Sequence, residues 1–253
     1  MLGLHPWFAK ECVSLRGTGG TTGDWPLMTS PVAFLFDLDG TLVDSVYNHV
    51  RAWHLALREQ GFDLSFWRIH RKIGMSGGLF TAQLERELGR AMDDATKQRL
   101  RDRHAELFRE LSSEVVPLPG AAELLRTLTE LELPWAIATS GRMRTAEANL
   151  RSLGLDPAAA TVVTRDQVRY AKPDPDLFVE AARRLGTATQ GSYVIGDSIW
   201  DMIAAARCGA LGIGLLSGGY GAEELERGGA LRVYDDPADM LLHLDEIAPR
   251  TKD

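Results

Sequence analysis

The sequence has few cysteines and no long hydrophobic run. Its two cysteines, Cys12 and Cys208, form neither a CxxC pair nor a disulfide framework, which favours a reducing, cytoplasmic environment. No apolar stretch approaches the roughly 20 residues that a membrane-spanning helix needs, so no membrane partner is expected. The six histidines show no paired metal-binding spacing. Any metal site is therefore expected to use oxygen ligands.

The chain also lacks an excess of positive charge. Its net charge of −7 argues against nucleic acid or an anionic membrane surface as a partner. A small anionic substrate stays open, because a local cation can dominate a site. The apolar fraction of 45% and the charged fraction of 25% are ordinary for a soluble globular protein. We expect a monomer or a small homo-oligomer.

Residues 1–30 lack the periodic pattern of the rest of the chain. They are rich in Gly and Thr in the middle, and no basic start precedes an apolar segment, as it would in a secretory signal. We therefore predict a disordered extension over residues 1–30.

From Val32 onward, short β-rich runs alternate with helical patterns. This alternation predicts an α/β fold, a doubly wound, mostly parallel, Rossmann-like sheet. The expected strands are Val32–Asp37, Trp135–Thr139, Thr161–Thr164, Tyr193–Asp197, Leu211–Leu216 and Leu231–Tyr234. The expected helices are Ala121–Leu131, Arg142–Leu153, Pro175–Leu185 and Ile199–Cys208.

The interval between the first strand and Trp135 breaks this alternation. It holds several helical patterns and no convincing strand, which exceeds the single helix that a crossover needs. We therefore predict an inserted all-helical cap at residues 46–116, and an α/β core made of residues 31–45 and 117–253.

Two carboxylates follow the first apolar strand, in the stretch FLFDLDGTLVDS. Asp37 and Asp39 are two residues apart, so they can face the same side as the chain leaves the strand. Like charges at this spacing repel, and a bound cation would offset the repulsion. Ligand sites of open parallel sheets lie beyond the carboxyl ends of the strands, and Mg²⁺ prefers oxygen ligands there. The pattern predicts a Mg²⁺ site.

This stretch resembles the first motif of the haloacid dehalogenase-like superfamily, in its phosphate-processing branch. The dehalogenases proper lack the second aspartate, so Asp39 points to phosphate chemistry. Three further stretches, WAIATSG, YAKPDPDLF and VIGDSIWDM, resemble the remaining motifs in the same order. The resemblance covers Val32 to Ile247.

The resemblance implies roles for particular residues. Thr139, Ser140 and Gly141 would bind the phosphate, although Thr139 and Ser140 also suit the cap of the following helix. Lys172 would contribute a positive charge to the same site. Asp197 would be a metal ligand together with Asp37 and the backbone carbonyl of Asp39. Asp201 would support the metal shell or contact Lys172.

The implied reaction proceeds through an aspartyl-phosphate. Asp37 would attack the phosphorus, while Asp39 would protonate the leaving oxygen and later activate water. Asp44 and Ser45 either begin the next helix or take a direct part.

The helical cap offers further candidates for substrate contact. The helix that carries His49 and Trp53 resembles that of the β-phosphoglucomutase-like subgroup, although both residues also suit a packed interior. The loop KIGMSGG, with Gly74 and Ser76, matches the substrate loop of such caps in its placement. The stretch SGGYGAEEL resembles phosphoglycolate phosphatases instead.

The sequence therefore predicts a Mg²⁺-dependent phosphatase of a small phosphorylated metabolite. A sugar-phosphate mutase is the alternative enzyme, and a phosphate-binding regulatory protein is the alternative of another class. A mutase needs a fixed cation for a second phosphate, and the mutases that this loop resembles have an arginine after the loop serine. Here Gly77 follows Ser76, which favours hydrolysis unless Arg71, Lys72 or Arg142 replaces that arginine.

Overall fold

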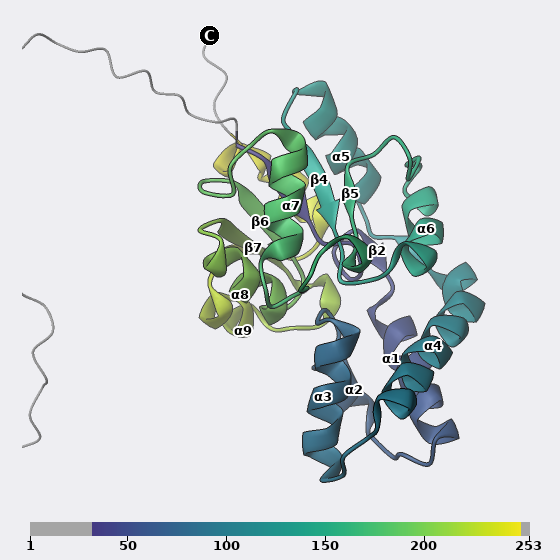
Figure 1. Cartoon of the computed structure of the whole chain (residues 1–253). Coiled ribbons are helices and arrows are strands. Elements are labelled where there is room, and N and C mark those ends of the chain that lie inside the picture. The colour runs from purple at the N-terminus through teal and green to yellow at the C-terminus, as the bar shows by residue number, and fades with distance from the viewer. Residues whose placement is uncertain (1–31, 249–253) are drawn as a thin grey trace, which may run out of the picture.

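A six-stranded parallel sheet forms the centre of the computed structural model, which describes residues 32–248 (Figure 1). The predicted extension at residues 1–30 lies outside this range. The strands follow the order β5 (Val162–Val163), β4 (Trp135–Ala138), β1 (Phe34–Phe36), β6 (Tyr193–Gly196), β7 (Leu211–Leu215) and β8 (Ala230–Tyr234). The predicted α/β fold with a parallel sheet is therefore confirmed.

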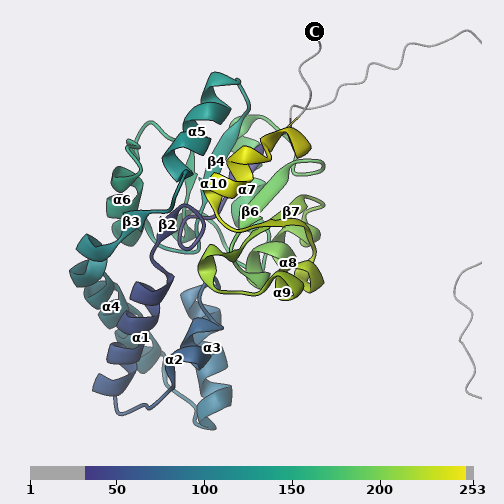
Figure 2. The same cartoon turned by 180° about the vertical axis from the view of Figure 1, so that it is seen from behind.

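Helices cover both faces of this sheet. Figure 1 shows α7 and α8 on one face, and Figure 2 shows α5 and α10 on the other. The helices of this part are α5 (Ala121–Glu130), α6 (Met143–Ser152), α7 (Asp176–Leu185), α8 (Ile199–Arg207), α9 (Ala222–Gly228) and α10 (Pro237–Leu242). The sequence patterns predicted α5 to α8 to within two residues at each end but did not predict α9 and α10.

The central strand β1 is buried on both sides, which explains its unbroken apolar sequence. Side chains alternate along a strand, so Leu35 faces one layer while Phe34 and Phe36 face the other. Leu35 packs in the cluster that contains Phe178 of α7, and Phe34 and Phe36 pack in the cluster that contains Leu124 of α5. Strands buried on both faces are typical of parallel sheets.

The long interval after β1 forms a bundle of helices below the sheet in Figure 1. These are α1 (Val46–Glu59), α2 (Phe66–His70), α3 (Gly77–Leu88) and α4 (Asp94–Leu111). The apolar stripe of α1, with Trp53 and Leu57, is buried against α4 and α3, where Phe108 and Phe80 lie. We refer to α1–α4 as the cap. The exact domain boundaries stay a prediction.

A small second sheet joins the cap to the α/β part. Strands β2 (Val43–Asp44) and β3 (Val116–Pro117) are antiparallel, with Val43 opposite Pro117 and Asp44 opposite Val116. The sequence pattern predicts no strand in this interval, because two residues are too short to show an alternating pattern. This pairing places the segment that leads into α1 beside the segment that follows α4.

Candidate active site

The motif residues meet at one edge of the sheet. Asp37 follows β1, Thr139 follows β4 and Asp197 follows β6, and all three side chains are buried. Lys172 Nζ lies 2.5 Å from Asp37 Oδ1 and 2.8 Å from Asp201 Oδ1. The carboxyl ends of adjacent parallel strands share an edge, so separate segments of the chain supply neighbouring side chains.

Three buried carboxylates form a cluster at this edge. Asp37, Asp197 and Asp201 can each offer one oxygen, and these oxygens lie within 4.8 Å of one another. Burial, together with the charge of Asp201 and against the attraction of Lys172, raises the pKa of Asp37 to about 7. Burial, followed by the charges of Asp201 and Asp37, raises the pKa of Asp197 well above its usual range. A hard divalent cation among these oxygens would stabilise their ionised forms, so the donor set fits Mg²⁺.

Two glycines enclose the carboxylate of Asp197. A Cβ atom on Gly218 would lie 1.8 Å from Asp197 Oδ2, and one on Gly40 would lie 2.6 Å from the same oxygen. The other oxygen, Oδ1, accepts a hydrogen bond of 3.2 Å from the Thr41 hydroxyl. The absence of side chains at both glycines therefore leaves the space that Asp197 fills.

Asp201 belongs to the first turn of α8 and contacts Lys172, as one of the two predicted alternatives stated. Its Oδ2 accepts hydrogen bonds from the Ser198 hydroxyl (2.5 Å) and the Ser198 backbone N–H (3.2 Å). Its Oδ1 faces Lys172. This carboxylate therefore fixes the lysine beside Asp37.

The carboxylate of Asp39 lies outside the acidic cluster. Its Oδ1 accepts hydrogen bonds from Ser45 Oγ (2.7 Å) and Asn149 Nδ2 (3.1 Å), and it lies 3.3 Å from His49 Nε2. Burial acts to raise the pKa of Asp39, but the charge of His49 and the hydrogen bonds from His49 and Ser45 outweigh it and lower the pKa. The repulsion between the two motif carboxylates is thus offset partly by these donors, in addition to any cation.

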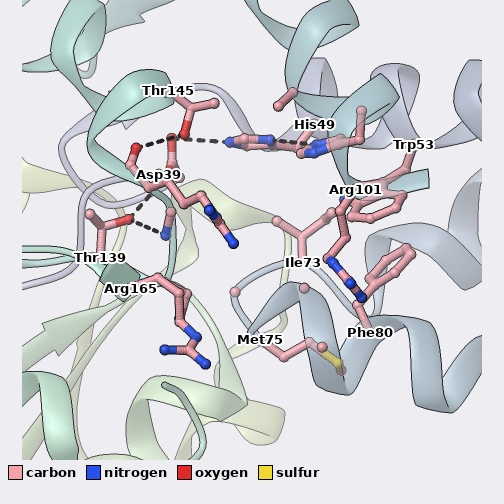
Figure 3. A pocket seen from close by; sticks show the side chains of 18 of the residues that line it. Asp39, His49, Trp53, Ile73, Met75, Phe80, Arg101, Thr139, Thr145 and Arg165 are labelled. Carbon is pink, nitrogen blue, oxygen red and sulfur yellow. Dashed lines mark hydrogen bonds and ion pairs between the residues drawn. The ribbon is translucent and has the colours of Figure 1, made fainter. Parts of the chain in front are cut away.

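The segment after β4 lies next to Asp39 (Figure 3). Thr139 Oγ accepts a hydrogen bond of 2.9 Å from the backbone N–H of Gly141, and the hydroxyl lies 3.5 Å from Asp39 Oδ2. Ser140 and Gly141 line the same cavity. Helix α6 begins directly afterwards, so the predicted phosphate-binding residues precede a helix N-terminus, where anions bind favourably.

A cavity of about 580 Å³ lies between the cap and the sheet edge. Asp37, Asp39 and Thr139 line it from the sheet, and His49 and Trp53 line it from α1. Figure 3 shows Asp39 and Thr139 on one side of this cavity and Trp53, Phe80 and Arg101 on the other. His49 stacks on Phe108 and Trp53 stacks on Phe80, so each residue both packs inside the cap and faces the cavity.

The cap loop before α3 both contacts the α/β part and lines the cavity. Gly74 lines the cavity, but a Cβ there would lie 2.7 Å from Ser198 Oγ, so this glycine permits close packing on the core. Ser76 does not line the cavity within the described chain. Its hydroxyl accepts from the Leu79 backbone N–H at the start of α3, and its own N–H donates to the Lys172 carbonyl.

Several cavity residues were missed by the sequence analysis. His104 and Arg101 lie on α4, and Arg144 and Arg165 lie on the α/β part. His104 Nε2 lies 3.1 Å from His49 Nδ1. Burial and the neighbouring His49 keep the pKa of His104 well below its usual value, so its ring is neutral. In the sequence, polar residues on an amphipathic helix have the pattern of a solvent-exposed face. Only the fold shows that these residues line the cavity.

The family model for haloacid dehalogenase-like hydrolases matches residues 32–209. The chain belongs to this family. It is 36% identical over 180 residues to hexitol phosphatase A of Escherichia coli, covering 70% of this chain and 79% of that protein. It is 32% identical over 216 residues to a phosphoglycolate phosphatase of Rhodospirillum rubrum, covering 83% of this chain and 89% of that protein. The predicted family and the predicted enzyme class, a phosphatase, are therefore confirmed.

A solved structure shows the same fold at higher identity. A hydrolase from Pseudomonas syringae is 56% identical, with a TM-score of 0.85, covering 86% of this chain and all of that one.

Within residues 32–248, no helix has the length and apolarity that crossing a bilayer requires.

Proposed function

We propose that this family member is a Mg²⁺-dependent phosphatase that hydrolyses a small phosphorylated metabolite through an aspartyl-phosphate intermediate. The observation that carries the proposal is the buried ion pair of Lys172 with Asp37, beside Asp197, with Asp37 lining the cavity. A carboxylate nucleophile is repelled by a phosphate ester, and positive charge at this position offsets the repulsion. The relatives named as phosphatases support the same chemistry.

The first half-reaction uses Asp37 as the nucleophile. One of its carboxylate oxygens donates an electron pair to phosphorus, and the ester bond between phosphorus and the leaving oxygen breaks. The Thr139 hydroxyl and the Ser140 backbone N–H hold phosphoryl oxygens during this transfer. Lys172 favours the ionised form of the nucleophile, because its charge lowers the pKa of Asp37 against the larger, opposite effect of burial.

Asp39 moves the protons in both half-reactions. Its Oδ1 already has three donors, so Oδ2 is the atom that gives a proton to the leaving oxygen and later takes one from water. The lowered pKa suits the base role. A phosphate dianion next to Oδ2 raises that pKa, which lets the same group carry a proton for the acid role.

The candidate metal ligands are Asp37, Asp197 and the backbone carbonyl of Asp39. When bound there, Mg²⁺ would supply charge that stabilises the phosphoryl oxygens and keeps the buried carboxylates ionised. Gly40 and Gly218 preserve the space for the Asp197 carboxylate, which supports a role that requires this side chain in one position.

Hydrolysis of p-nitrophenyl phosphate with added Mg²⁺, with and without EDTA, tests the proposal. We expect EDTA to abolish turnover and Asp37→Asn to eliminate it without loss of thermal stability, because the substitution changes charge but little volume. Asp39→Asn should lose about 10²- to 10⁴-fold in rate. It should also accumulate phosphoenzyme, which mass spectrometry detects. Turnover by Asp37→Asn near the wild-type rate would refute the mechanism.

A further inference from the structure

Arg101 is a cap cation that lines the cavity without an acidic partner in the described chain. Arg101 of α4 lines the cavity, is partly buried, and forms no ion pair with any residue of the described chain. Its Nη2 donates a hydrogen bond of 2.7 Å to Gln98 Oε1, and its Nη1 lies 3.5 Å from Thr81 Oγ. The Gln98 amide nitrogen donates to Asp102 Oδ2 (2.9 Å), so the amide presents its oxygen to Arg101. Neutral groups therefore orient the guanidinium without cancelling its charge.

Most other cations around the cavity are neutralised. Lys72 Nζ lies 2.6 Å from Glu87, Arg144 lies 3.0 Å from Asp102, and Arg142 lies 3.6 Å from Asp166. Arg165, on the side of the α/β part, donates to the Val168 carbonyl (2.7 Å), and its backbone N–H binds the Gly141 carbonyl. Arg165 thus lies beside the proposed phosphate site. Arg101 is the remaining uncompensated charge on the cap side of the described cavity.

Arg101 also occupies the space next to the cap loop. A Cβ atom on Gly77 would lie 3.4 Å from Arg101 Cδ, so the stem of the arginine packs over this glycine. Because Gly77 follows Ser76, the loop itself has no arginine at this position. The fold brings the side chain of Arg101 from α4 to this glycine. Arg71 and Lys72, proposed as substitutes, are instead paired with Glu224 and Glu87.

The surroundings of Arg101 favour an anionic ligand. Trp53 and Phe80 stack with ring centroids 4.0 Å apart on the same side of the cavity (Figure 3). An aromatic wall lowers the local dielectric constant, which strengthens the attraction between a cation and an anion. A partly buried charge without a partner is unfavourable, and a ligand anion removes that cost.

We propose that the substrate carries a second anionic group, a carboxylate or a second phosphate, and that Arg101 determines specificity by binding it. This inference rests on the proposed phosphatase function and adds the substrate class. The ester phosphate binds at the sheet edge beside Thr139, and the second anion binds under the cap. A planar guanidinium binds carboxylate and phosphate oxygens in a bidentate manner, which makes it selective for both groups.

Matched pairs of phosphate esters test the inference. One pair is 2-phosphoglycolate and 2-hydroxyethyl phosphate, and the other is fructose 1,6-bisphosphate and fructose 1-phosphate. For each ester, phosphate release gives kcat/KM for the wild type, Arg101→Gln and Arg101→Lys. Arg99→Gln is the matched control, because Arg99 is exposed on the same helix and binds only Thr96 there.

We expect the wild type to prefer the anionic member of at least one pair. Arg101→Gln should reduce that preference about 10- to 100-fold, the size of a lost charge-assisted hydrogen bond. Arg101→Lys should retain part of it, and Arg99→Gln should retain all of it. The pair that responds distinguishes a carboxylate from a second phosphate.

Two results would overturn the inference while leaving the proposed function intact. The first is hydrolysis of these esters by the wild type with a preference for the neutral members. The second is an equal loss of kcat/KM for both members of each pair in Arg101→Gln. Hydrolysis of neither these esters nor p-nitrophenyl phosphate in the presence of Mg²⁺ would instead refute the phosphatase proposal and the inference together.

Discussion

Substituting Gly218 by alanine tests whether Asp197 must occupy one position. The new Cβ would lie 1.8 Å from Asp197 Oδ2, whereas a carbon–oxygen contact is normally about 3.3 Å, so the overlap is about 1.5 Å. Gly218 is not among the glycines with positive φ, so its backbone suits alanine without strain. The substitution therefore perturbs space alone.

The carboxylate of Asp197 has little room to yield. Gly40 lies against the same oxygen, and the Thr41 hydroxyl holds the other. Relief of the overlap requires a shift of Asp197 or of the Gly218 segment by about the size of the overlap. A misplacement of about 1 Å in a reacting site can cost about 100-fold in rate. We expect a loss of this size in kcat/KM and a higher Mg²⁺ concentration for half-maximal activity.

The assay compares Gly218→Ala with Gly221→Ala. A Cβ on Gly221 meets only Glu224 Oε2, at an ordinary 3.6 Å, so this control changes the same segment without a collision. Overpacking costs about 1–3 kcal/mol, so both variants should remain folded at room temperature, which thermal melting checks. Equal activity and equal Mg²⁺ dependence of the two variants would refute the argument that Asp197 needs this space.

Two further predictions concern the proton-transfer residue and the core. His49→Phe removes a group that lowers the pKa of Asp39, while burial, which raises it, remains. Asp39 must be ionised to act as a base, so the acidic limb of the pH profile for phosphoenzyme hydrolysis should move to higher pH; an unchanged limb would contradict this role for His49. Phe36→Ala should lower the free energy of unfolding by about 3–5 kcal/mol in urea titrations, because this side chain is fully buried. Val179→Ala, at a side chain that is 45% exposed, should change it by less than about 0.5 kcal/mol, and similar losses for the two would show that β1 packs differently.

The sequence predicted the sheet edge well because its signals are local. Asp37, Thr139 and Asp197 each follow a short apolar strand, and parallel strands carry such residues to the same edge. The helices α5 to α8 were predicted because their apolar faces repeat at helical spacing over ten or so residues. The strands β2 and β3 were missed because two residues show no period.

The cap side of the site was predicted less well because its contacts join distant segments. Arg101 meets Gly77 only after α3 and α4 pack together, and no spacing in the sequence indicates that contact. Ser76 looked like a ligand-binding residue, but its hydroxyl begins α3. Ser45 was ambiguous between a helix start and a direct role. It precedes α1 without capping it through its side chain, and its hydroxyl donates to Asp39.

The pairing of β2 with β3 has a consequence for how this architecture can be modified. The chain leaves the sheet and returns to it at neighbouring residues, with Val43 opposite Pro117. The segment that contains α1–α4 therefore begins and ends at neighbouring positions. A chimaera joined at these two residues would exchange the wall that faces Thr139 and leave the strand order unchanged. The proposed catalytic carboxylates lie outside the exchanged segment, but Ser45 and His49, whose side chains contact Asp39, lie inside it. A chimaera that keeps these two residues would therefore change the cap wall of the cavity while retaining the contacts of Asp39.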